Sequence, residues 1–287
     1  MSVTDLEYNG QRLSDLGCML CDFSGNSGIE TVSIGSSITL NTLNRPSLKK
    51  FTLMSAKYEQ PFSQVFQICK NPCKFMNREP IFSDIEISKL MRWLNKKTYH
   101  KFKMLYDDGK CSNMYYIGTF NDVKVVKLNE DIIGLEITFT ANAPFGYYEP
   151  LSFEMDFSDA GTDFTIYDIS DEIGYIYPNK LQITVLQDGD LKIKNSQETD
   201  TVIIKNCTTG EVITMDGENK VITSSIEHSG LYNDFNYNFI KIINKCGDND
   251  DYFAVDSEED EVENIFTTTL PCKIELTYSP ICKMGVI

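Results

Sequence analysis

Histidine and tryptophan are nearly absent from this chain, whose 287 residues include two histidines and one tryptophan. A Ser-His-Asp or Cys-His site would therefore have to use His100 or His228. His100 begins an expected strand and His228 precedes a turn at Gly230, so both read as ordinary hydrogen-bonding residues. Gly-x-Ser-x-Gly and phosphate-binding glycine motifs are also missing. We expect no catalytic residue, no cofactor site and no enzyme activity.

Long apolar runs and excess positive charge are missing too. No stretch of 18 apolar residues occurs, and Met1–Asp5 lacks the features of a signal peptide, so we expect no membrane insertion. The 26 basic residues against 42 acidic ones give a net charge of -16. This balance argues against sequence-specific nucleic-acid binding and against docking on an anionic membrane. In a reducing cytosol, the nine cysteines are expected to be mostly free thiols.

Two cysteine pairs have a spacing that zinc could use, Cys18-x-x-Cys21 and Cys69-x-x-x-Cys73. The segment that holds the first pair is expected to be extended, and residues three apart on a strand point to opposite faces. A loop that brings the sulfurs together is the alternative. We expect structural thiols and no metal site.

An acidic stretch, residues 248–263, invites a calcium interpretation. Asp248, Asp250 and Glu259 fall at positions 1, 3 and 12 of an EF-hand loop, but Phe253 stands where glycine is required. A solvated acidic loop is the expected structure, with an irregular calcium site or a docking patch as alternatives.

One helix is clearly indicated, within residues 83–97. Ser83 and Glu86 form a capping box, and the helix is expected to run to Asn95, with Lys96 and Lys97 favouring its C-terminal end. Its apolar stripe consists of Ile87, Leu90, Met91 and Leu94.

The rest of the chain reads as strands. Those near the helix are Leu6–Tyr8, Ser37–Leu43, Lys50–Tyr58, Val65–Cys69, His100–Tyr106, Met114–Phe120, Val123–Lys127 and Ile133–Ala143. In the last of these, Leu135, Ile137, Phe139 and Ala141 share one face. The pattern predicts one helix on a curled antiparallel sheet.

Pro144 and Pro150 mark a change of pattern, and we place a domain boundary between residues 148 and 149. Short strands follow at Leu181–Leu186, Leu191–Asn195, Thr201–Asn206, Glu211–Met215, Val221–Ser224, Phe239–Ile243 and Lys273–Tyr278. Many short strands at even spacing are typical of a β-sandwich. The predicted class is mainly β: a curled antiparallel sheet or barrel with one α-helix in residues 1–148, and a β-sandwich in residues 149–287.

A set of short phrases carries a family resemblance. They are Asn9-Gly10 before Leu13-Ser14-Asp15-Leu16-Gly17, Leu90-Met91-Arg92-Trp93-Leu94, Leu105–Asp108, Tyr115–Gly118, Ala143–Tyr147, Tyr175–Pro178 and Asn206–Gly210. In this order and spacing the chain resembles the distal tail proteins of long-tailed, non-contractile phages.

The resemblance implies a structural virion protein without cofactors. The N-terminal domain would form a hexameric ring around a DNA channel, and the C-terminal sandwich would be galectin-like. The ring would sit at the tail-tube end as the baseplate hub. Its implied partners are the tail tube protein, tail-associated or tape-measure proteins and a receptor-binding protein. Assembly would take place in the host cytoplasm.

Two other functions remain open. A carbohydrate-binding adsorption protein without a ring would need exposed aromatics. Trp93 lies in the first domain, so the sandwich would have to use tyrosines such as Tyr232 or Tyr237. A hydrolase would need a cleft with paired carboxylates, and no motif supports one.

Overall fold

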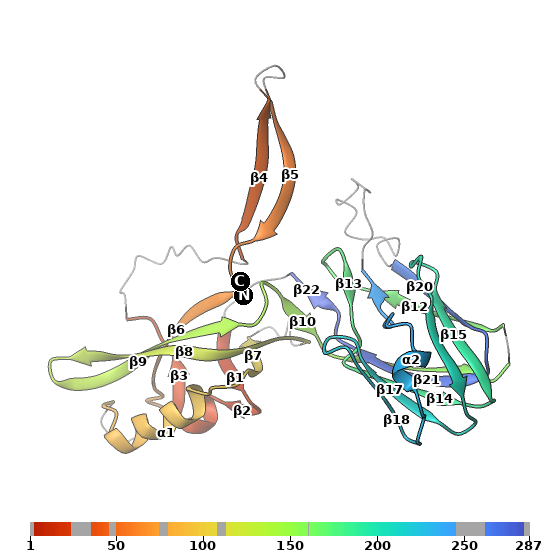
Figure 1. Cartoon of the computed structure of the whole chain (residues 1–287). Coiled ribbons are helices and arrows are strands. Elements are labelled where there is room, and N and C mark those ends of the chain that lie inside the picture. Colours follow the sequence, from red (N-terminus) through yellow and green to blue (C-terminus); the bar gives the residue numbers. More distant parts are fainter. Residues whose placement is uncertain are drawn as a thin grey trace. The chain divides into compact units, whose positions relative to one another are not determined.

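Strands make up nearly all of the regular structure, which divides into two units (Figure 1). The computed structural model describes residues 3–23, 36–45, 50–74, 80–107, 113–159, 161–244 and 262–283. The first unit comprises Met1–Tyr147 with Lys283–Ile287, and the second comprises Tyr148–Cys282. The expected mainly-β class is confirmed.

The first unit contains one curled antiparallel sheet, one α-helix and a separate two-stranded ribbon. The helix α1 spans Asp84–Leu94, and a 3₁₀ turn η1 spans Ser14–Leu16. Its strands are β1 (Val3–Tyr8), β2 (Gln11–Arg12), β3 (Cys18–Leu20), β4 (Ile38–Arg45), β5 (Lys50–Tyr58), β6 (Ser63–Lys70), β7 (His100–Tyr106), β8 (Met114–Leu128), β9 (Asp131–Ala141) and β10 (Gly146–Tyr148). The main sheet has the order β2-β1-β7-β8-β9-β6-β3, and β4 pairs with β5.

Aromatic rings pack closely in the core of the first unit. The ring of Phe102 stacks on Phe139 at 4.2 Å between centroids, and Phe120 meets Tyr8 edge-on at 5.1 Å. All four are almost completely buried. Leu135, Ile137, Phe139 and Ala141 are buried together, as their alternation predicts.

The helix α1 begins as predicted and ends earlier. Both hydrogen bonds of the Ser83–Glu86 capping box are present. The helix ends at Leu94 because Asn95 has a ψ of 82°, outside the helical region, so Lys96 and Lys97 lie beyond it. Of the predicted stripe, Leu90 and Leu94 are buried and Ile87 and Met91 are half-buried, while Trp93 is buried as well. Each buried side chain contributes about 1.5–3 kcal/mol by burial.

The β8–β9 ribbon also differs from prediction. The two expected strands Met114–Phe120 and Val123–Lys127 form one strand, because a register shift between Phe120 and Asp122 takes the place of a turn. A turn at Asn129 joins β8 to β9, and its φ of 58° is one that asparagine tolerates. Gly118 is required within β8, because an added Cβ would lie 2.3 Å from the Thr140 carbonyl oxygen.

The second unit is a two-sheet sandwich. Its strands are β11 (Leu151–Phe157), β12 (Asp163–Asp168), β13 (Tyr175–Ile176), β14 (Lys180–Val185), β15 (Gly189–Asn195), β16 (Val202–Cys207), β17 (Val212–Asp216), β18 (Val221–Ser224), β19 (Ile242–Ile243), β20 (Val262–Thr268), β21 (Cys272–Tyr278) and β22 (Ile281–Cys282), with a one-turn helix α2 (Leu231–Asp234). One sheet has the order β11-β21-β14-β17-β18 and the other β12-β20-β15-β16. Residues from both sheets form one buried core, including Ile183, Ile213, Ile193 and Phe266.

Sequence patterns missed three long strands of the sandwich, β11, β12 and β20. Within the predicted strand Phe239–Ile243, residues Ile242–Ile243 alone form β19, while Phe239 and Ile240 are buried without joining a sheet. The two ends of the unit meet, because the Tyr148 N–H donates to the Pro280 carbonyl over 2.9 Å. In the described residues, no helix is long and apolar enough to cross a membrane.

Candidate functional site

The strands β4 and β5 form a ribbon that we call the arm (Figure 1). In the described part of the chain, these strands pair with each other and with no other strand. The pairing brings Ile38 opposite Tyr58 and Leu43 opposite Thr52, with a register shift after Asn41. One edge of each strand therefore lacks a backbone partner among the described strands.

Large apolar side chains are exposed on both faces of the arm. Their exposed fractions include 60% for Leu40, 68% for Phe51 and 64% for Met54. The alternation and register place Ile38, Leu40, Phe51 and Leu53 on one face and Leu43 on the other, with Met54 at the register shift. An apolar surface of this kind is typical of a protein–protein contact.

The arm also differs in charge from the rest of the protein. Residues 38–58 contain four basic residues and no acidic residue. Since the whole chain carries -16, the remainder carries -20. The arm therefore combines apolar side chains with a charge opposite to that of the molecule that bears it.

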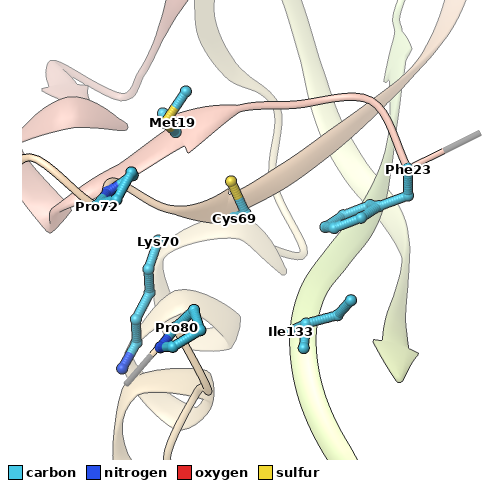
Figure 2. A pocket seen from close by; sticks show the side chains of 7 residues that line it. All are labelled: Met19, Phe23, Cys69, Lys70, Pro72, Pro80 and Ile133. Carbon is cyan, nitrogen blue, oxygen red and sulfur yellow. The ribbon is translucent and has the colours of Figure 1, made fainter. Parts of the chain in front are cut away.

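A shallow apolar pocket of about 440 Å³ lies between β3, β6, β9 and the segment that precedes α1 (Figure 2). It is lined by Met19, Phe23, Cys69, Lys70, Pro72, Pro80 and Ile133. Phe23 packs on the bare backbone of Gly134, where a Cβ would lie 2.2 Å from the ring. Lys70, the one charged lining residue, forms an ion pair with Glu86 at 2.7 Å. The pocket thus holds neither a nucleophile–base pair nor paired carboxylates.

The structure gives Cys18 and Cys21 different degrees of burial, and the Cys69 thiol acts on both. Cys18 is buried, whereas Cys21 is half-buried and lies against Cys69. Burial, reinforced by the Cys69 thiol, raises the pKa of Cys21 to about 12 and that of Cys18 to about 11. Cys73 is exposed. Among the described residues, no three His, Cys, Asp or Glu side chains are grouped to hold a metal ion.

The histidines lie in different units. His100 Nε2 contacts the Thr98 hydroxyl over 2.9 Å. His228 is almost fully buried, with Nδ1 2.8 Å from Glu211 and Nε2 3.3 Å from Asp234. Burial alone would lower the pKa of His228, but the two carboxylates outweigh it and raise the pKa.

This histidine cluster lacks the order of a catalytic triad. The Ser224 hydroxyl donates to Glu211 over 2.7 Å rather than to the imidazole. A nucleophile must be within hydrogen-bonding reach of its base. The cluster therefore connects Glu211, just before β17, with β18 and α2. Sequence spacing did not reveal this cluster.

The aromatic candidates are distributed unevenly. Trp93 is buried and donates its Nε1–H to the Tyr8 carbonyl over 3.0 Å. Tyr232 and Tyr237 are 62% and 58% exposed. Sequence patterns did not single out Tyr175 as a candidate, although it is 54% exposed. The acidic stretch 248–263 lies outside the described residues except for Val262 and Glu263.

Two family models match the chain over almost its whole length. Residues 1–143 match a phage tail protein N-terminal domain, and residues 145–278 match a phage tail C-terminal domain. A comparison with curated proteins finds no match.

Among solved structures, the chain is similar to the Dit protein (gp 19.1) of SPP1, described as a paradigm of the hub adsorption apparatus in phages that infect Gram-positive bacteria. The identity is 11%, the TM-score is 0.61, and the match covers 97% of this chain and 99% of that one. Two further matches are phage P2 baseplates in the activated conformation. The calcium form has 10% identity, a TM-score of 0.46 and coverage of 96% and 98%. The strontium form has 11% identity, a TM-score of 0.41 and the same coverage.

Proposed function

The chain belongs to the phage tail proteins whose N-terminal and C-terminal domains match it, and from this premise we propose that it is the distal tail protein, the hub of the baseplate. In this role, six copies form a closed ring at the end of the tail tube. The ring connects the tube protein and the tail-associated or tape-measure proteins to the receptor-binding protein. It assembles in the host cytoplasm and resides at the tail tip of the virion.

The arm is the observation that supports ring formation most directly. A two-stranded ribbon is marginally stable alone in water, and this one exposes apolar side chains on both faces. A neighbouring subunit that covered the arm would remove those side chains from water and could pair its free edges.

Charge favours a second copy of the chain as that neighbour. Residues 38–58, which include both strands of the arm, carry four positive charges, whereas the rest of each subunit carries -20. Contact between the arm of one subunit and the body of the next is heterologous, and such contacts close into rings when their rotation permits. In this arrangement, the arm of every subunit contacts the body of one neighbour, and its own body receives the arm of the other neighbour.

Light scattering and negative-stain electron microscopy test the ring. The wild-type protein should form six-membered rings, and Phe51→Ser with Leu53→Ser should yield monomers with an unchanged circular dichroism spectrum. Tyr167→Ser, which changes an exposed aromatic of the sandwich, should leave the rings intact. Wild-type protein that stays monomeric at high concentration would contradict the proposal and favour an adsorption protein that acts without a ring.

A further inference from the structure

Tyr175 presents an exposed ring on a rigid part of the sandwich unit. It lies on β13, which pairs with β19 through Tyr175–Ile243 and Ile176–Ile242. Its ring meets that of Tyr177 edge-on at 5.3 Å, and Lys241 Nζ lies 5.1 Å from its centre. With 54% of its surface exposed, Tyr175 remains accessible to a ligand.

Buried asparagines hold this strand pair in place. The Asn264 side chain accepts from the Ile243 N–H over 2.8 Å and donates to the Ile243 carbonyl over 3.0 Å. Asn195 donates to both Asn264 and the Lys241 carbonyl, over 2.7 and 3.1 Å. These bonds connect β19 to the sandwich strands β15 and β20, so Tyr175 is positioned before any ligand arrives.

Lys220 supplies a positive charge next to the ring of Tyr177, the neighbour of Tyr175. Its Nζ lies 4.0 Å from the centre of the Tyr177 ring and donates to the Tyr177 hydroxyl over 2.5 Å. Tyr177 is itself fixed against Gly217, where a Cβ would overlap the ring. The Tyr175 and Tyr177 ring centres are 5.3 Å apart, and Lys220 Nζ lies 4.0 Å from the Tyr177 ring centre. The distance from Lys220 Nζ to the Tyr175 ring centre is therefore no greater than the sum of these two.

The two lysines of this cluster differ in their partners. Lys241 forms an ion pair with Glu198 at 2.8 Å. In the described part of the chain, Lys220 contacts aromatic rings and a hydroxyl but no carboxylate. Asp216, in the same turn, is bonded to Asn219. Lys220 is therefore available to an external anion.

We propose that Tyr175 and Lys220 form a binding site for an anionic saccharide. The sugar ring stacks on Tyr175, and its phosphate or carboxylate group accepts a hydrogen bond from the Lys220 ammonium. The protein is strongly acidic as a whole, so this local ammonium gives the anion a specific place to bind. Such binding does not require ring formation.

The same features distinguish this site from the other exposed tyrosines. Tyr232 and Tyr237 are similarly exposed, but no lysine lies over either ring among the described residues. A stacking surface without a neighbouring cation would not select for charge. One sugar ring on one aromatic face binds weakly, so we expect a dissociation constant in the millimolar range for a monosaccharide.

Saturation-transfer NMR on the full chain tests the site with glucose 6-phosphate, glucose 1-phosphate, glucuronate and glucose. At least one anionic sugar should bind about tenfold more tightly than glucose. Tyr175→Ala should weaken binding about tenfold, and Tyr175→Phe should preserve it. Lys220→Met, which keeps the apolar stem over Tyr177, should reduce the affinity of the anionic sugar to that of glucose.

Matched controls are Tyr232→Ala and Lys194→Met, which should bind like the wild type. Failure of all three anionic sugars to bind would overturn the proposal. Unchanged binding in Tyr175→Ala, or displacement of the sugar by an equal concentration of inorganic phosphate, would also overturn it, because either result would indicate an anion contact without stacking.

Discussion

The ammonium of Lys70 lies 2.7 Å from the carboxylate of Glu86, and this ion pair joins β6 to the first turn of α1. The same carboxylate accepts hydrogen bonds from the Ser83 N–H and hydroxyl, over 2.8 and 2.7 Å. Partial burial opposes ionisation, but the bonds from Lys70 and Ser83 lower the pKa of Glu86 to about 2. One side chain therefore caps the helix and attaches it to the sheet.

Glu86→Gln should destabilise the first unit by about 1–2 kcal/mol at neutral pH. Because the folded-state pKa is depressed, the ionised group stabilises the fold above about pH 4.5, and this contribution is lost as the pH falls toward 2. The difference between mutant and wild type should therefore shrink in acid. Fluorescence of Trp93, the single tryptophan, reports unfolding of this unit in urea.

Glu130→Gln, in the exposed β8–β9 turn, is the matched control and should behave like the wild type. Equal urea midpoints for Glu86→Gln and the wild type at neutral pH would show that the ion pair contributes nothing to stability.

Local sequence rules account for the framework of the first unit. The Ser83–Glu86 box and the alternation of Leu135–Ala141 each depend on residues close in sequence, so their geometry follows from spacing. The end of α1 does not follow from nearby residues, because the Lys96 carbonyl accepts a hydrogen bond from the distant Thr119 hydroxyl. The alternation of Leu151–Phe157 is a local signal for β11, whereas acidic residues at both ends of β12 obscure its strand pattern.

His228→Gln should destabilise the second unit by about 1 kcal/mol at about pH 6, with a smaller effect at about pH 9. The folded-state pKa of His228 is raised, so the charged imidazole stabilises the fold below about pH 6.5. That stabilisation is lost as the pH rises through the folded-state value. Calorimetry measures the change in stability, because Trp93 does not report on this unit.

An NMR titration provides an independent check, because the chain has two histidines. His100→Gln leaves one imidazole and so assigns the resonances. A midpoint for His228 below 6.5 would contradict the charged pairing with Glu211 and Asp234.

Thiol alkylation at neutral pH should distinguish the described cysteines. Cys73 is exposed and should react first with iodoacetamide. Cys207 and Cys272 are buried, and burial raises the pKa of each thiol to about 11, so their reaction should be about a hundredfold slower. Peptide mapping by mass spectrometry measures the rates, with guanidinium-unfolded protein as the control in which all sites react alike. Equal native rates for Cys73 and Cys207 would contradict the observed burial.

The candidate surfaces were harder to predict than the strands. Alternation at Ile38–Leu40 and Phe51–Leu53 indicates strands, but it has the same form whether the apolar face is buried or exposed. The exposure of the arm depends on which strands pair with it, which is a long-range property. Tyr175 and Lys220 are likewise far apart in sequence, and the folded chain brings both against Tyr177.

The backbone bond from Tyr148 to Pro280 has a consequence for how such a protein can diversify. The sandwich is inserted between Tyr147 and Lys283, and its entry and exit strands leave from one place. A different domain whose two ends lie equally close together could replace the sandwich at the same position. The helix α1 and the strands β1–β9 would be unchanged in such an exchange.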